Sequence, residues 1–350
     1  MNLISIANAF RVETTIYSVE PYGEGHINQT FVATGEKKRY ILQKINTKLF
    51  TNPAQLMFNI EKVTEHIANK YKAQGKSTER LLQIVPTLAG EPFLRTEEGC
   101  FRMYKFIEDA ISHQSANEQR FYQSAVAFGQ FAQDLSDFDA SVLYDILPNF
   151  HNTAVRFTHF ENAVNADMVG RKSSIEKEID FFMQRKQYCD MLVSRLKDGR
   201  LPLRVTHNDT KLNNVMLDEK TDAPVAVIDL DTVMSGSICY DFGDSIRFGC
   251  NTGAEDERDL DKVHFSLPLY RSYAKGFLSA FPTVTDEEKR MLPYGAIIMT
   301  YECGMRFLTD YLQGDVYFRT AREGHNLDRC RTHIKLIEEM ESVFSQMQLD

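Results

Sequence analysis

The sequence predicts an α+β fold with two lobes, a small β-rich lobe at residues 1–106 and a larger helical lobe at residues 107–350. Strand-like segments separated by turn residues are prominent in the first part. From about residue 116 onwards, apolar residues recur at helical spacing. The length of 350 residues also allows roughly two domains of about 150 residues each.

The N-terminal lobe is expected to contain a β-hairpin followed by a helix. Residues 31–34 and 39–45 have strand character, and a polar turn at residues 35–38 joins them. A helix is predicted over residues 53–73, because Pro53 suits a first turn and apolar residues follow at helical spacing. Three further strands are expected, at residues 81–86, 92–95 and 100–107.

The C-terminal lobe is expected to be mainly helical. Apolar residues mark one amphipathic helix near residues 121–135 and another at residues 174–197. The inward positions of the second helix are Ile179, Phe182, Tyr188 and Leu192. Three more helices are expected, near residues 262–281, 286–313 and 326–348. Short strands within residues 205–231 interrupt this helical series.

Composition and charge favour a soluble globular protein. The net charge is −9, from 40 Lys and Arg against 49 Asp and Glu, which argues against nucleic acid or a membrane surface as a partner. No stretch approaches the roughly 20 apolar residues of a membrane span, and the N-terminus lacks the pattern of a secretion signal. The six cysteines form no CxxC pair, so disulfides and a zinc cluster are not expected. We expect a cytoplasmic monomer or weak homo-oligomer.

Residues 205–231 read VTHNDTKLNNVMLDEKTDAPVAVIDLD and contain the residue types that phosphoryl transfer requires. Asp209 lies at the expected end of a strand, where a carboxylate can take the proton of an acceptor hydroxyl. Lys211 can reach the same space and offset the charge of the transferring group. Asn214 follows Asp209 by five residues, so the loop can fold back and turn the amide oxygen towards a metal ion.

Two further carboxylates end the same segment. Asp229 follows the apolar run at residues 225–228, which predicts a buried strand. A buried carboxylate needs a compensating cation, and Mg²⁺ prefers oxygen ligands. Asp231 is expected to share this metal or hold a second one, because positions 229 and 231 point the same way if the backbone between them is extended.

Residues 241–243 spell Asp-Phe-Gly, the metal-binding triplet of protein kinases, but the spacing disagrees with that role. Asp229 follows Asp209 by 20 residues, whereas Asp241 follows it by 32. We therefore predict that Asp229 is the metal ligand and that Asp241 braces the catalytic loop. His207 is expected to orient the same loop by hydrogen bonding and not to act as a base.

The motif H-x-D-x-K-x-x-N followed by I-D-x-D resembles the aminoglycoside and choline phosphotransferase branch of the protein-kinase-like fold. Wider stretches closely resemble the N-acetylhexosamine 1-kinase family, at residues 22–28, 39–43, 206–214, 228–232, 241–249 and 302–308. The resemblance implies a bilobal protein-kinase-like fold. It also implies a kinase that uses ATP and Mg²⁺ to phosphorylate the anomeric hydroxyl of N-acetylglucosamine or N-acetylgalactosamine.

The resemblance also implies which residues bind the acceptor sugar. His26 and Asn28 are expected to face the sugar from the N-terminal lobe. Arg306 lies among apolar neighbours on a predicted helix and is expected to point into the cleft, with Tyr317 as a weaker candidate. Asp209 would contact the sugar hydroxyl directly.

The nucleotide is expected to bind beneath the N-terminal hairpin. The turn that holds Gly23 and Gly25 would cover the ATP phosphates with backbone N–H groups, although a short glycine pair is also common in ordinary turns. Gln43 stands where the family pattern places a lysine, and Lys44 points to the opposite face of the strand. Glu61 is a possible partner for such a cation or an ordinary surface carboxylate.

Residues 106–108 are expected to form the hinge between the lobes, where the backbone of Phe106 and Glu108 would meet adenine. Two alternative functions stay open. A kinase of the same branch could act on choline, an aminoglycoside or another alcohol, and Asp244, Glu255 and Asp256 lie near enough in sequence to attract a cation. A pseudokinase is the second alternative, although the intact catalytic residues argue against it.

Overall fold

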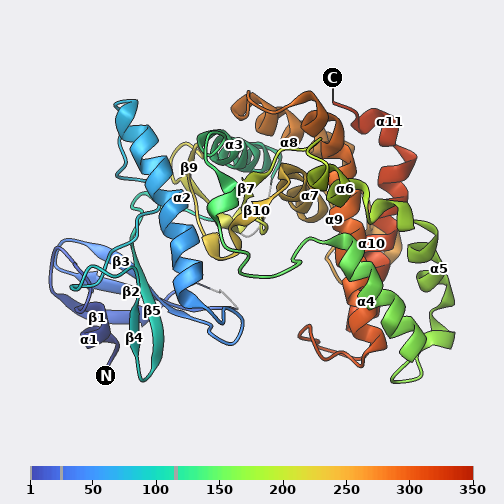
Figure 1. Ribbon diagram of the computed structural model, residues 1–350, viewed down its shortest axis with the longest axis horizontal. Helices are drawn as coiled ribbons and strands as arrows, with labels where there is room; N and C mark the ends of the chain where they lie inside the picture. Colours follow the sequence, from blue (N-terminus) through green and yellow to red (C-terminus); the bar gives the residue numbers. More distant parts are fainter. Residues whose placement is uncertain (1, 24–26, 114–116, 350) are drawn as a thin grey trace.

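The computed structural model describes residues 2–23, 27–113 and 117–349, and these residues form two lobes. Figure 1 shows an antiparallel sheet with the N-terminus on one side and a larger group of helices with the C-terminus on the other. The helix α2, at Pro53–Ala73, and the yellow strands of the motif segment lie between these two parts. The α+β fold with a small N-terminal sheet and a larger helical part is confirmed.

The N-terminal sheet has five strands in the order β1-β2-β3-β5-β4. The predicted hairpin is present, since β2 at Gln29–Gly35 pairs with β3 at Arg39–Ile45. The other strands are β1 at Ile16–Pro21, β4 at Leu94–Thr96 and β5 at Gly99–Lys105, and a short helix α1 at Leu3–Ala7 packs on this sheet. In the register of β3 and β5, Gln43 lies directly opposite Arg102.

Helix α2 has the bounds that the sequence predicts, Pro53–Ala73. Its N-cap is Asn52, whose side chain accepts a hydrogen bond from the backbone N–H of Gln55. The buried face includes Leu56, Ile60 and Val63, which pack in one cluster with Val205 and Val233 of the C-terminal lobe. The helix therefore joins the core between the lobes.

The predicted strand at residues 81–86 is wrong. Only an isolated bridge between Ile84 and Tyr104 forms there, with the Val85 N–H donating to the Met103 carbonyl. Pro86 has no N–H to donate, which prevents a regular ladder from continuing. The strand expected at residues 92–95 is shifted to Leu94–Thr96, and the strand expected at residues 100–107 ends earlier, at Lys105.

The C-terminal lobe is mainly helical. Its α-helices are α3 at Glu118–Asp134, α4 at Thr153–Ala166, α5 at Glu176–Gln184, α6 at Met191–Lys197, α7 at Ile238–Gly249, α8 at Leu267–Ala280, α9 at Asp286–Leu312, α10 at His325–Ser342 and α11 at Phe344–Met347. Helix α9 lies centrally and packs against α4, α7 and α10. The expected helices near residues 121–135 and 286–313 are confirmed.

The expected helix at residues 174–197 is wrong as a single helix. It breaks into α5, a 3₁₀ turn at Lys186–Tyr188, and α6. The break lets Arg185 and Tyr188 both bind Glu341 of α10, at 2.8 Å each, and buries Cys189. Helix α8 begins at Leu267, not near residue 262, because the Ser266 side chain caps its N-terminus. The helix expected at residues 326–348 divides into α10 and α11.

Short strands within the helical lobe carry the motif. Strand β7 at Arg204–Thr206 pairs with β10 at Met234–Gly236, and β6 at Ala110–Ile111, β8 at Val215–Asp218 and β9 at Pro224–Val227 form a second small sheet. The remaining turns are 3₁₀ helices at Ala140–Val142, Lys172–Ser174, Leu212–Asn214, Leu230–Thr232 and Leu260–Lys262. Within the described ranges, every helix is too short or too polar to cross a bilayer.

Candidate active site

The loop between β7 and β8 is fixed by its own side chains. The buried His207 ring accepts a hydrogen bond from the Asp209 N–H at Nδ1, 3.2 Å, and its Nε2 donates to the Ile228 carbonyl, 2.9 Å. Asn208 has a positive φ of 65° and donates to the Thr232 carbonyl. These bonds link the catalytic loop to the segment that bears Asp229. The orienting contacts expected of His207 are present.

Asp209, Lys211 and Asn214 lie together at the start of this loop. The Lys211 Nζ is 2.7 Å from one carboxylate oxygen of Asp209. The Asn214 Nδ2 donates to the backbone carbonyl of Asp209 at 2.8 Å and to its other carboxylate oxygen at 3.1 Å. Because the amide nitrogen is engaged in this way, the Oδ1 of Asn214 faces away from Asp209. Burial alone would lower the pKa of Lys211, but Asp209 and Asp244 outweigh it, so the pKa is raised and the lysine stays charged.

Asp241 lies at the start of α7, beneath the catalytic loop and away from the cleft. Its two carboxylate oxygens accept hydrogen bonds from the backbone N–H groups of His207, 2.8 Å, and Asn208, 2.7 Å. Burial raises the pKa of Asp241 to about 6, while these contacts lower it. The Asp-Phe-Gly triplet therefore braces the loop, as its spacing predicted.

Asp229 stands at the end of β9, but the local structure differs from the expectation in two respects. Strand β9 is half-buried, not buried. The backbone after it is not extended, since Asp229 has a φ of 59° and Leu230–Thr232 forms a 3₁₀ turn. Asp229 is exposed to the open cleft, yet desolvation by the surrounding protein raises its pKa to about 6, helped by the negative charges of Asp231 and Asp209.

Asp231 turns away from the cleft, contrary to its expected role as a metal ligand beside Asp229. It is 4% exposed and forms an ion pair with Arg102 of β5. Its second oxygen accepts a hydrogen bond from the Nδ2 of Asn28 at 2.5 Å. The side chain of Asn28 is thus engaged by protein atoms, because its Oδ1 also accepts from the Asn46 N–H. Both carboxylate oxygens of Asp231 are occupied.

The N-terminal lobe contributes Gln43 and not Lys44 to the wall of the cleft. Gln43 lines the cleft, whereas Lys44 lies on the other face of β3 over the ring of Phe101. Glu61 is an exposed residue of α2. Gly23 lines the cleft with a positive φ of 73°, which suits glycine. The predicted contacts of Gly25 and His26 lie outside the described residues.

The residues expected to form the hinge lie at the wall of the cleft. Phe106 lines it and packs edge-on against Tyr22, with ring centroids 5.9 Å apart. The guanidinium of Arg39 lies 3.9 Å above the Phe106 ring and pairs with the carboxylate of Glu108. The side chain of Glu108 therefore points outwards, so any contact of this residue with adenine must come from its backbone.

Arg306 and Tyr317 come together on the helical lobe. The Nη2 of Arg306, on α9, lies 3.5 Å from the Tyr317 hydroxyl. Arg156 of α4 is a neighbour that the sequence did not single out. Burial lowers the pKa of Arg156, and the positive charge of Arg306 lowers it further. Two guanidinium groups therefore share this region.

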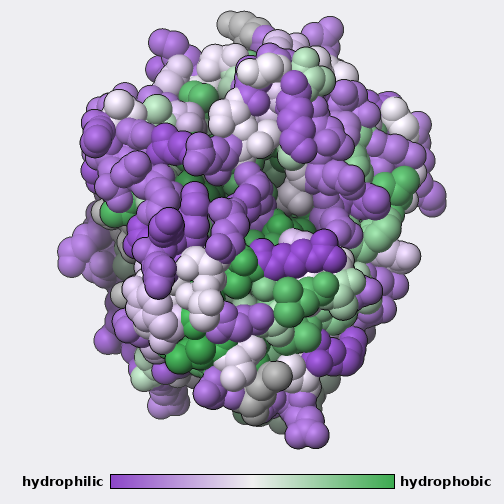
Figure 2. Space-filling view, turned by 90° about the vertical axis from the view of Figure 1, so that its left-hand side faces the viewer, coloured by the Kyte–Doolittle hydropathy of each residue, from purple (hydrophilic) through white to green (hydrophobic). Residues whose placement is uncertain are grey.

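The cleft between the lobes has a volume of about 650 Å³. It brings together most of the predicted site residues: Gly23, Asn28, Gln43, Phe106, Asp209, Lys211, Asn214 and Asp229. Arg102 also lines it and was missed in the sequence, where a lone cation within the apolar strand at residues 100–104 was the available signal. Figure 2 shows the face at the left of Figure 1, where the surface is mostly hydrophilic and apolar residues gather around a central hollow.

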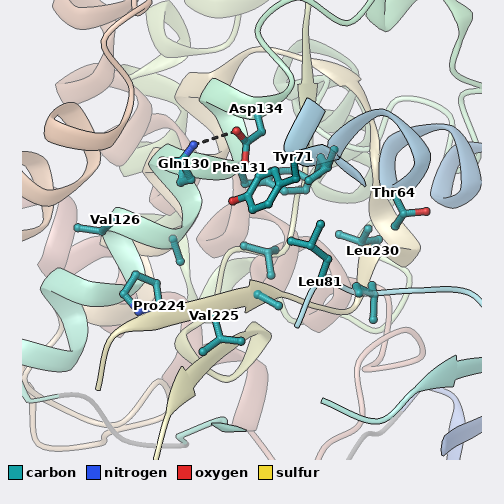
Figure 3. Close-up of a pocket in the computed structure, with 15 residues that line it drawn as sticks. Thr64, Tyr71, Leu81, Val126, Gln130, Phe131, Asp134, Pro224, Val225 and Leu230 are labelled. Atoms are coloured by element: carbon teal, nitrogen blue, oxygen red, sulfur yellow. Dashed lines mark hydrogen bonds between the residues drawn. The ribbon is translucent and has the colours of Figure 1, made fainter. Parts of the chain in front are cut away.

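A second, smaller cavity of about 280 Å³ lies between α2, α3 and β9. Figure 3 shows its polar corner, where Gln130 donates to Asp134 at 2.9 Å and Tyr71 lies close by. Burial raises the pKa of Tyr71 to about 12, with Asp134 adding to the effect. The other lining residues are mostly apolar, and the cavity holds no predicted catalytic residue.

A two-lobed fold that gathers an aspartate, a lysine, an asparagine and a second aspartate at one cleft is typical of phosphotransferases of the protein-kinase-like fold. Residues 18–275 match the phosphotransferase enzyme family. The chain therefore belongs to this family.

Solved structures share the fold at low sequence identity. An aminoglycoside phosphotransferase from Alicyclobacillus acidocaldarius matches with a TM-score of 0.65 and 14% identity, over 99% of this chain and 95% of that one. A spectinomycin phosphotransferase in complex with ADP and spectinomycin matches at 0.58 and 14%, over 99% and 98%. Ethanolamine kinase from Plasmodium vivax matches at 0.55 and 14%, over 95% and 84%.

Proposed function

We propose that this phosphotransferase transfers the γ-phosphoryl group of ATP to the anomeric hydroxyl of N-acetylglucosamine or N-acetylgalactosamine. The observation that carries phosphoryl transfer is the convergence of Asp209, Lys211, Asn214 and Asp229 at one cleft. The wider sequence resemblance to N-acetylhexosamine 1-kinases supports the sugar. ADP bound to the spectinomycin phosphotransferase of the same fold supports an adenine nucleotide as donor.

In this proposal Asp209 accepts the proton of the sugar hydroxyl while the hydroxyl oxygen bonds to the γ-phosphorus and ADP leaves. The 2.7 Å contact with Lys211 holds the Asp209 carboxylate in place and keeps a positive charge beside the transferring group. The Asn214 amide fixes the other carboxylate oxygen. An anomeric hydroxyl is more acidic than an ordinary alcohol, so a modest base is sufficient.

Asn214 and Asp229 are suited to holding Mg²⁺. Asn214 has its amide oxygen turned away from Asp209, and in the described part of the chain no basic side chain forms an ion pair with Asp229. The raised pKa of Asp229 comes first from desolvation and then from the negative charges of Asp231 and Asp209, and a hard cation would compensate both effects. When bound, Mg²⁺ would neutralise charge on the ATP phosphates.

The electrostatics on the acceptor side favour a neutral, hydroxyl-rich molecule over a cation. Arg306 and Arg156, which do not line the cleft itself, lie near each other on the helical lobe, and in this proposal the acceptor extends towards these two positive charges. The nearby carboxylates are engaged within the protein: Asp244 pairs with Arg247 at 2.8 Å, and Glu302 forms hydrogen bonds with His151 at 3.0 Å and Thr153 at 2.6 Å. Choline, ethanolamine or an aminoglycoside would meet repulsion that a sugar avoids.

The test is ADP release with Mg²⁺ and ATP over a panel of N-acetylhexosamines, free hexoses, choline, ethanolamine and aminoglycosides. We expect release that depends on N-acetylglucosamine or N-acetylgalactosamine, with the phosphate located on carbon 1 by NMR. The variant Arg306→Met should raise KM for the sugar and leave the ADP affinity unchanged. Activity with a cationic acceptor alone would overturn the proposed substrate.

A further inference from the structure

Arg102 is a buried cation at the junction of the two lobes. It lies on β5 of the N-terminal sheet and is 1% exposed, although it forms part of the cleft wall. Its guanidinium pairs with Asp231, which lies between β9 and β10 of the C-terminal lobe. Figure 1 shows β5 and β10 in different parts of the molecule. The ion pair therefore ties the sheet that covers the nucleotide cleft to the turn that follows Asp229.

The guanidinium is also held from the N-terminal side. The Nε of Arg102 donates to the Oε1 of Gln43 at 2.9 Å, and the Nε2 of Gln43 donates to the Thr30 hydroxyl at 3.0 Å. On the other side, Asn28 donates to the carboxylate oxygen of Asp231 that does not pair with Arg102. Thr30 on β2, Gln43 on β3 and Arg102 on β5 therefore form a continuous series of polar contacts that ends at Asp231.

A buried ion pair of this kind is poorly explained by stability alone. Removing two charges from water costs several kcal/mol, and apolar side chains of similar size are often equally stable in such a place. The position of the pair offers a better explanation. Gln43 is uncharged where a kinase-like lobe normally has a lysine, and the other N-lobe cations that line the cleft, Arg39 and Lys105, face Glu108 and Glu13 near the hinge.

We propose that Arg102 is a positioning residue for phosphoryl transfer. It holds Asp231 and thereby sets the Asp229 turn against the nucleotide-covering sheet, and it supplies from β5 the positive charge that a lysine at position 43 of β3 would otherwise bring. Arg102 acts through Asp231 and Gln43 and not by contact with the acceptor. This inference rests on the proposed use of Mg²⁺ and an adenine nucleotide.

The first test measures ADP affinity by calorimetry, with and without Mg²⁺, and needs no knowledge of the acceptor. We expect Mg²⁺ to increase the ADP affinity of the wild type. In Arg102→Met, this increase in affinity should be about 10-fold smaller, because Mg²⁺ requires well-placed ligands. Arg102→Lys keeps the charge but lacks the fork that binds Gln43 and Asp231 together, so its gain should be intermediate. This variant serves if Arg102→Met does not fold.

The matched control is Arg185→Met, which removes an arginine–glutamate pair of 2.8 Å between α5 and α10, away from the cleft. It should lower the melting temperature and leave the gain from Mg²⁺ unchanged. An Arg102→Met or Arg102→Lys protein whose gain equals or exceeds that of the wild type would overturn the inference. A wild type without any gain from Mg²⁺ would instead overturn the proposed function.

The second test asks whether charge at position 43 substitutes for Arg102. With the sugar acceptor, Arg102→Met should lower kcat by about 100-fold, as expected for a small misplacement at a reacting centre, with little change in KM for the sugar. Adding Gln43→Lys to Arg102→Met should recover part of kcat, while Gln43→Lys alone should lower it by placing two cations side by side. If kcat of the double variant does not recover, a positive charge at position 43 does not substitute for Arg102.

Discussion

At the scale of single residues, the loop that carries Asp209 is held in shape by side chains that form hydrogen bonds with its backbone. His207 receives the Asp209 N–H and donates to the Ile228 carbonyl, so its neutral tautomer is fixed by the two contacts. Asp241 receives two successive N–H groups of the same loop. With its backbone held in this way, the Asp209 carboxylate is oriented by Lys211 and Asn214.

Replacing Asp209 by Asn should remove the proton acceptor and leave the site's shape intact. Because general-base catalysis contributes about 10²–10⁴-fold, we expect Asp209→Asn to lower kcat by that order while ADP affinity stays nearly constant. The measurement is steady-state ADP release together with ADP calorimetry. Asp222→Asn, the same aspartate-to-asparagine change at a residue that does not line the cleft, is the control and should keep full activity. Wild-type turnover by Asp209→Asn would remove this residue from the mechanism.

The sequence identified residues whose chemistry depends on local spacing and missed partners that depend on the fold. Asp209, Lys211 and Asn214 lie within six positions, so one motif predicts their convergence. Asp231 has its partner Arg102 on a strand 129 positions earlier (231 − 102), in the other lobe. The spacing of Asp229 and Asp231 suggested a shared metal ion. The 3₁₀ turn at Leu230–Thr232 instead makes the two carboxylates point in different directions, and the sequence did not reveal this turn.

At the scale of elements, helix α2 belongs to both lobes. Its buried Asn59 donates to the carbonyls of Tyr144 and Val233, at 2.8 and 2.9 Å, and accepts from the Tyr144 N–H at 2.9 Å. These three bonds fasten the helix to the C-terminal lobe close to β10. The helix itself was predictable from apolar spacing, but no local pattern reveals that an asparagine on its buried face is an anchor.

The variant Asn59→Ala should leave the buried Val233 carbonyl without its partner and remove the two bonds to the partly exposed Tyr144 backbone. An unsatisfied buried group costs about 1–3 kcal/mol, so we expect the free energy of unfolding to fall by about this amount. Denaturant titration gives this value. Thr64→Ala, which loses only hydrogen bonds to its own helix at Ile60 and Glu61, is the matched change on α2 and should cost well under half as much. Equal losses would show that Asn59 is not an interlobe anchor.

Helices α7 and α9 cross with their backbones in contact. A Cβ atom on Gly243 would lie 2.2 Å from the Gly295 carbonyl oxygen, and one on Gly295 would lie 2.3 Å from the Cys239 carbonyl oxygen. This close crossing places Asp241, on α7, beneath the catalytic loop. The sequence alone did not show that these two glycines lie at a helix crossing, because no local pattern indicates which helices pack together.

Gly243→Ala should therefore disturb both stability and catalysis. Overpacking of this kind costs about 1–3 kcal/mol, and the shift of α7 should carry Asp241 with it and lower kcat. The control is Gly276→Ala on α8, where a Cβ would lie 2.7 Å from the Tyr122 carbonyl oxygen. It should cost similar stability with kcat of the folded protein kept. Unfolding curves and turnover distinguish the two, and an unaffected kcat in Gly243→Ala would contradict the link through α7.

At the scale of the whole molecule, a buried charge network spans the C-terminal lobe behind the catalytic loop. Arg247 binds Asp244 at 2.8 Å and Glu255 at 3.1 Å, and its Nη1 lies 3.5 Å from the Nε2 of His333. Glu255 and His333 lie close enough, with Cys303, to suggest a metal site, but the guanidinium already supplies the positive charge there. His333 must remain neutral, since its Nε2 accepts from Arg247.

The neutral state of His333 makes the stability of the fold depend on pH. Burial, with Arg247 adding to it, lowers the pKa of His333 to about 4, below its ordinary value of about 6.5. The unfolded chain therefore binds the proton first, and the stability contributed by His333 is present above about pH 6.5 and declines towards pH 4, by roughly 3 kcal/mol in full. The raised pKa of Asp241 acts in the opposite direction over part of this range, but it does so in any His333 variant as well. Denaturant titrations of wild type and His333→Gln should accordingly show wild-type stability falling more steeply between pH 6.5 and 4.5, and parallel curves would mean that His333 accepts its proton within the fold.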